Sequence, residues 1–263
     1  MSFDFSFRRL QLLVRKQWLE NRRFYMLSFT TIAILVALSI LLFWFLPGGS
    51  EYEEGELMIF YLVGLFVINS IFASMAFQAL GNKEKGQYVL TLPATHGEKL
   101  INALLFSMLF FPVVYSAIFW VLESIAVQLV MLKGAKIHRF TDFANPHNVI
   151  IVLAIYLAVT SLFLLGSVYF KRYAFIKTVI VSAAIFSLYA YLINVLGKSL
   201  VPDGFRWEFQ KVFNYNPLGK NSPVYYEYSL DRWAEAGTLF LVKYIWAPFF
   251  WFVTWFRLKE KEI

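Results

Sequence analysis

Residues 26–46 read MLSFTTIAILVALSILLFWFL, a run of 21 residues without a charged side chain. At about 1.5 Å per residue, a helix of this length crosses a hydrocarbon layer of roughly 30 Å. The whole chain has 263 residues, of which 59% are hydrophobic and 16% are charged, and this is too apolar for one water-soluble core. The sequence therefore predicts an integral, multi-pass membrane protein.

The residues before this first span predict an amphipathic helix at the membrane surface. Apolar side chains within residues 3–19 fall on about a quarter of a helical wheel, and basic side chains occupy the other side. We expect the apolar stripe to lie among acyl chains and the arginines to face anionic headgroups of the cytoplasmic leaflet, so membrane lipids are partners. A solvated basic tail is the alternative. The stripe consists of Phe3, Phe7, Leu10, Val14 and Trp18, and the arginines include Arg8, Arg15 and Arg22.

Further apolar runs predict five more spans. They cover residues 57–80, a stretch from residue 100 to Glu123, and residues 149–170, 176–196 and 238–256. Polar residues of the second span, among them Asn69, Ser70 and Ser74, either allow close helix packing or line a path. Pro248 can kink the last span.

The distribution of charge predicts the orientation. Six basic residues precede the first span, three more close the chain after residue 256, and the loop after the first span carries four glutamates. Cytoplasmic loops are enriched in Lys and Arg, so both termini are expected in the cytoplasm. The predicted fold class is all-α, with an interfacial helix over residues 1–25, a six-span domain over 26–256, a large outer loop over 197–237 and a cytoplasmic tail over 257–263.

A polar segment separates the second and third spans. Residues 81–99 read GNKEKGQYVLTLPATHGEK and predict a short amphipathic helix, a turn at Pro93 and the start of the third span. Thr95 and Glu98 form a T-x-x-E capping box, which should begin that span sharply. A capped turn between two spans would explain these features without a partner. The other residues of interest are Lys83, Glu84, Lys85 and Gln87 on the polar side, with Leu90 and Leu92 among the apolar residues.

The chain shows no motif for catalysis. It lacks the G-x-x-x-x-G-K-[ST] phosphate loop, H-E-x-x-H and G-x-S-x-G, and its three histidines fall in predicted loops. We expect no catalytic, cofactor or metal site in this chain. The net charge of +7 is assigned to membrane topology rather than to nucleic-acid binding.

Together, the basic N-terminal helix, six spans, the loop of type K-E-K-G-x-Y-x-L-x-L-P-A-T-x-x-E-K and the large outer loop resemble the membrane (permease) subunit of a type-2 ATP-binding-cassette (ABC) exporter. The resemblance implies that residues 83–92 form a coupling helix in a groove of a separate cytoplasmic ATPase, and that residues 3–23 form a connecting helix. ATP and Mg would bind that ATPase, and a second permease subunit would complete a homo- or heterodimer. It also implies a place in a bacterial inner membrane.

Two other functions fit the same residues. A non-transporting membrane anchor or assembly subunit of a larger envelope complex could use residues 81–99 to recruit a cytoplasmic partner. An intramembrane enzyme would need acids or histidines held within the bundle, and the sequence offers Glu123 alone in a long apolar run. We therefore expect an exporter subunit that is not itself an enzyme.

Overall fold

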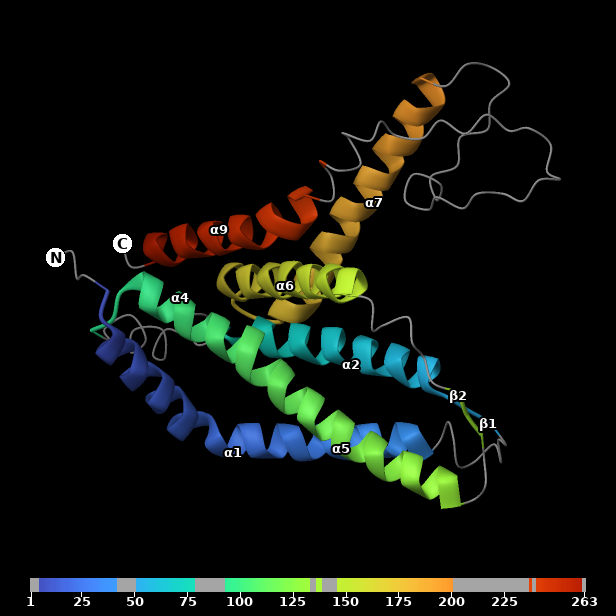
Figure 1. Ribbon diagram of the computed structural model, residues 1–263. Coiled ribbons are helices and arrows are strands. Elements are labelled where there is room, and N and C mark those ends of the chain that lie inside the picture. Colours follow the sequence, from blue (N-terminus) through green and yellow to red (C-terminus); the bar gives the residue numbers. More distant parts are fainter. Residues whose placement is uncertain are drawn as a thin grey trace.

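The computed structural model describes residues 5–41, 51–78, 93–132, 136–138, 146–200, 237 and 240–261. Most of these residues are helical, and two short strands form one ladder (Figure 1). The helical elements are α1 (Phe7–Ile40), α2 (Glu54–Met75), α4 (His96–Leu104), the π-helix η3 (Leu105–Phe110), α5 (Phe111–Leu132), α6 (Pro146–Tyr169), α7 (Ala174–Leu200), the π-helix η6 (Leu241–Ile245) and α9 (Trp246–Glu260).

Five helical stretches of the described residues are long and apolar enough to cross a membrane. They coincide with the first five predicted spans, so the prediction of a helical, multi-pass membrane architecture is confirmed. The predicted sixth span corresponds to η6 and α9, which are not among the five. Helix α7 continues to Leu200, so the outer loop begins later than residue 197. The five stretches are Phe7–Ile40, Met58–Met75, His96–Leu129, Val149–Tyr169 and Ala174–Leu192.

The predicted surface helix and the first span form one continuous helix. Helix α1 extends over 34 residues from Phe7 to Ile40. Its sequence contains no proline or glycine, so no residue interrupts the backbone hydrogen bonds where the amphipathic part meets the apolar part. Figure 1 shows that α1 nevertheless bends, with its first turns running at an angle to the rest. At the predicted boundary near residue 25, the helix surface changes from amphipathic to apolar, but the helix does not end there.

A small ladder joins two loops that the all-α prediction treated separately. Strand β1 (Glu51–Glu53) pairs in parallel with β2 (Lys136–His138), with Glu51 opposite Lys136. These strands follow the first and third apolar stretches, and both lie at the same end of the bundle (Figure 1). Three-residue strands are too short to show a period-2 pattern, so the sequence did not predict them.

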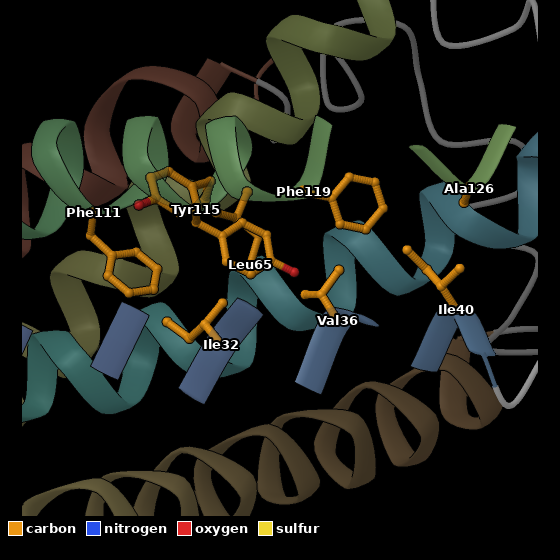
Figure 2. Packing of buried hydrophobic residues seen from close by; sticks show 9 residues of the cluster. Ile32, Val36, Ile40, Leu65, Phe111, Tyr115, Phe119 and Ala126 are labelled. Carbon is orange, nitrogen blue, oxygen red and sulfur yellow. The ribbon is translucent and has the colours of Figure 1, made fainter. Parts of the chain in front are cut away.

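Helix α6 is the central element of the bundle. It packs along α2 and α9 and also contacts α7, whereas α1 packs on α4 and α5. Aromatic side chains on successive turns of α5 face α1 and α2 across the main apolar cluster (Figure 2). The members of this cluster are Ile32, Val36, Ile40, Leu65, Phe111, Tyr115, Phe119, Ala126 and Tyr156.

The polar residues of the second span serve helix packing. Asn69, Ser70 and Ser74 are all buried. The side-chain amide of Asn69 donates a 2.7 Å hydrogen bond to the Thr160 hydroxyl on α6. Hydrogen bonds between helices are a normal means of association in membranes, so this contact of Asn69 supports the packing interpretation.

Two interior prolines are each preceded by a π-helical turn. Leu105–Phe110 comes before Pro112, and Leu241–Ile245 comes before Pro248. In the π register, the N–H of Phe111 bonds to the carbonyl of Phe106, and the carbonyl of Ser107 would pair with residue 112, which has no N–H. The Tyr156 hydroxyl on α6 donates to this Ser107 carbonyl at 3.0 Å. Tyr156 thus replaces the backbone donor that Pro112 lacks.

Tyr156→Phe should lower the free energy of unfolding by about 1–3 kcal/mol, because it leaves the buried Ser107 carbonyl without a donor. Adding Pro112→Ala should recover part of this loss, since alanine supplies the missing N–H. The measurement is unfolding of the purified chain in detergent. Tyr189→Phe, at an exposed tyrosine, is the matched control and should leave stability unchanged. If Tyr156→Phe were as stable as the original chain, the proposed replacement of the backbone donor would be wrong.

Candidate functional site

The start of α4 is the best-defined part of the predicted coupling region. Thr95 has an extended backbone and caps the helix: its hydroxyl accepts from the Glu98 N–H at 3.2 Å, and the Glu98 carboxylate accepts from the Thr95 N–H at 2.9 Å. The predicted capping box is therefore confirmed. Pro93 lies two residues before this cap and is exposed. The residues that precede it in the predicted coupling helix, namely Lys83, Glu84, Lys85, Gln87, Leu90 and Leu92, lie outside the described residues.

Glu98 also binds the beginning of α1. Its second carboxylate oxygen accepts from the Ser6 N–H at 2.8 Å and from the Arg9 guanidinium, whose Nε and Nη2 both lie at 3.1 Å. The Glu98 side chain is fully buried. One carboxylate thus joins two helix starts that are about 90 residues apart in the sequence. We call the residues Ser6, Arg9, Thr95 and Glu98 the Glu98 junction.

The electrostatics of the Glu98 junction favour an ionised carboxylate. Ser6 is the N-cap of α1, and Glu98 lies in the first turn of α4. Helix N-termini carry a partial positive charge and unpaired N–H groups, which stabilise an anion between them. The guanidinium of Arg9 supplies a full positive charge. These donors together compensate the cost of burying the carboxylate.

Further contacts join α1 to the third helix over several turns. The Asn102 amide donates to the Gln17 side chain, and Gln17 in turn donates to the Tyr25 hydroxyl at 3.1 Å. The Trp18 ring packs edge-on against Phe110, with ring centroids 5.4 Å apart. The Glu98 junction is therefore one end of an extended interface.

The apolar stripe of the N-terminal helix faces this interface more than we expected from the sequence. Leu10 is buried, and Val14 and Trp18 are half-buried. Phe7 is 73% exposed, and Phe3 lies outside the described residues. The stripe was expected to lie among acyl chains. From Leu10 to Trp18 it instead packs on the protein. The exposed arginines are Arg8, Arg15 and Arg22.

The other side of α4 packs against α6 and α9. A second apolar cluster contains Leu100 and Ala103 of α4, Leu164 and Val168 of α6, and Leu258 of α9. Helix α4 therefore lies between α1 on one side and the pair α6 and α9 on the other. Any displacement of its first turn must be accommodated by both.

Sequence reasoning found the capping box but missed the role of Arg9 and Ser6. A capping box is a local pattern of four residues, which one sequence can reveal. The pairing of Arg9 with Glu98 depends on how α1 folds against α4, and an arginine on a basic helix gives no sign of which carboxylate it will bind. Among the described residues, no group of three or more His, Cys, Asp or Glu side chains is placed to hold a metal ion.

Comparisons of this chain with protein-family models, with curated proteins and with solved structures found no match. The function is therefore inferred from the residues and their contacts. The Glu98 junction holds two helix starts in a fixed relation.

Arg9→Met and Glu98→Gln should each destabilise the chain, and a double-mutant cycle should show coupling of about 1.5–3 kcal/mol, the usual value of a hydrogen bond to a charged group. Glu98→Gln retains the size of the side chain but loses the charge. Arg8→Gln, one residue away and exposed, is the matched control with no expected coupling to Glu98→Gln. The measurement is the unfolding free energy in detergent. Simple additivity of Arg9→Met and Glu98→Gln would contradict the ion pair.

Proposed function

We propose that this chain is the transmembrane permease subunit of an ATP-driven exporter of the ABC type. A separate cytoplasmic ATPase would bind and hydrolyse ATP with Mg, and a second permease subunit would complete the transport path. The observation that carries the proposal is the Glu98 junction, because it follows in the sequence the segment that resembles a coupling helix and ties the first turn of α4 to the N-terminal helix.

The contacts suggest how a displacement of residues 83–92 would be transmitted to the membrane helices. Pro93 and Thr95 connect that segment to the first turn of α4, and Glu98 connects the same turn to Ser6 and Arg9 of α1. Helix α4 continues through η3 into α5 without a loop. A displacement at the cytoplasmic end would therefore reach two membrane helices together, as the energy-coupling step of a transporter requires.

A six-span topology is part of the proposal. The sixth span would be formed by η6 and α9, which run from Leu241 to Glu260 beside α6. The start of α1 and the end of α9 lie at the same end of the bundle (Figure 1), which suits an even number of spans. The excess of basic residues at this end favours a cytoplasmic location in a bacterial inner membrane.

Labelling of introduced cysteines would test this topology, and the chain has no native cysteine to give a background signal. A membrane-impermeant maleimide applied to intact cells should label Tyr52→Cys in the first outer loop. Gln11→Cys and Lys259→Cys should react only after the membrane is opened. Labelling of Lys259→Cys but not of Gln11→Cys in intact cells would place the two termini on opposite sides and exclude six spans.

Charge reversal in the coupling segment would test the function. The triple variant Lys83→Glu/Glu84→Lys/Lys85→Glu should bind the ATPase subunit at least about tenfold more weakly, equivalent to about 1.4 kcal/mol, because like charges would meet across the contact. The measurements are recovery of a nucleotide-hydrolysing subunit with the tagged chain and ATP hydrolysis by the purified complex. Glu51→Lys/Glu53→Lys, in the predicted outer loop, is the matched control and should preserve both.

The outcomes separate the proposed functions. Normal recovery of the ATPase with the triple variant would argue against the contact at residues 83–85. A reconstituted complex that hydrolyses ATP but moves no substrate would favour the membrane anchor. Conversion of a lipid by the purified chain without ATP would favour an intramembrane enzyme.

A further inference from the structure

The corner between α6 and α7 meets the end of α9 in a basic cluster. The Lys261 ammonium group donates to the Val168 carbonyl in the last turn of α6. The Arg257 guanidinium lies over the Tyr169 ring, 4.7 Å from its centroid. Two segments about 90 residues apart in the sequence thus form one surface. The basic residues of this surface, which we call the corner cluster, are Lys171, Arg172, Lys177, Arg257, Lys259 and Lys261.

The corner cluster has far more positive than negative charge. Among its described residues one acid is present, Glu260, which pairs with Arg257; the sequence adds Glu262. Burial lowers the pKa of Lys261, and the positive charges of Arg257 and Lys171 lower it further. Arg257 and Lys171 therefore each repel the Lys261 ammonium group. A bound anion would remove this repulsion.

The corner itself is held in an unusual backbone conformation. Tyr173 has a φ of 55°, in the left-handed region that a non-glycine residue adopts at an energetic cost. Its side chain is 73% exposed, so no packing of the ring compensates for this cost. Lys171 and Arg172, immediately before it, are also exposed. Strain of this kind is common where a surface binds a ligand.

Apolar surface begins directly beside the cations. Helix α7 exposes Ile176, Val179 and Ile180 from its first turns onward, and α9 exposes Phe252 and Phe256. Lys177 and Lys259 lie over aromatic rings, 5.8 Å from Phe170 and 5.9 Å from Trp255. Long basic side chains next to aromatic rings are typical of the zone where headgroups meet hydrocarbon. The surface therefore suits a ligand with an anionic head and an apolar body.

We propose that the corner cluster binds the headgroup of an anionic phospholipid, whose acyl chains lie along the exposed apolar faces of α7 and α9. An acidic protein surface would satisfy the cations but would leave the adjoining apolar residues unused, so the lipid fits better. Basic sites between membrane helices bind anionic headgroups in this way. The inference does not depend on transport or on an ATPase.

The test compares two lipids with the same acyl chains, phosphatidylglycerol and phosphatidylcholine, added to the purified full chain in neutral detergent. The readouts are the increase in Tm and the lipid retained in native mass spectrometry. Phosphatidylglycerol should raise Tm more than phosphatidylcholine does. Lys171→Gln/Arg172→Gln should weaken binding of phosphatidylglycerol about tenfold or more. These two side chains are exposed, and removing the Lys171 charge relieves its repulsion of Lys261, so Tm without lipid should stay unchanged or rise slightly. If it falls, Lys177→Gln/Lys259→Gln is the second variant.

Lys133→Gln/Arg139→Gln is the matched control, because it removes the same charge from residues that flank β2 in the sequence and that have no proposed lipid contact. It should bind phosphatidylglycerol as the original chain does. Equal loss in the control and in the Lys171 and Arg172 variant would show that overall charge, not the corner cluster, attracts the lipid, and would overturn the proposal. So would an equal effect of phosphatidylcholine, or full stabilisation by inorganic phosphate alone. Unchanged binding of phosphatidylglycerol by both corner-cluster variants would likewise overturn it.

Discussion

A carboxylate buried away from water costs several kcal/mol unless charged and hydrogen-bonding partners surround it. The Glu98 carboxylate meets this condition through the N–H groups of Ser6 and Thr95 and the guanidinium of Arg9. If any of these donors moved away, the Glu98 carboxylate would lose a hydrogen bond or its counter-charge while still buried. The start of α1 and the start of α4 are therefore expected to move together. The described residues of the bundle are arranged around this constraint, because α4 is also packed against α6 and α9 on its other side.

The third membrane helix has three parts with different constraints. Its first turn is held by Glu98, its middle is the π-helix η3, and its last part, α5, packs through Phe111, Tyr115 and Phe119 against α1 and α2 (Figure 2). The π-helix lies between the two fixed parts, and its altered hydrogen bonding depends on one side-chain donor, Tyr156. Helix bends occur where the regular hydrogen-bond pattern is interrupted, so η3 is the place where α4 and α5 can change their relative direction.

The sequence predicted what depends on local patterns. Long apolar runs located the first five apolar helices, and a four-residue motif located the cap at Thr95. It did not predict the continuity of α1, since a change from an amphipathic to an apolar surface was taken for a helix boundary although no proline or glycine occurs there. The ladder of β1 and β2 and the pairing of Arg9 with Glu98 depend on contacts between distant segments. A single sequence holds no record of such contacts.

The distribution of buried charge bears on where energy could enter the protein. Among the residues whose burial is described, the buried polar side chains deep in the bundle are neutral, such as Asn69, Thr160 and Ser107. The buried charged side chains are Glu98 and Lys99, both in the first turn of α4. Neutral hydrogen bonds of this kind hold helices together. The charged first turn of α4 follows residues 81–92 in the sequence, and Lys83, Glu84 and Lys85 lie in that segment. Under the proposed function, the buried charges of the described residues are thus concentrated beside the segment at which energy would enter.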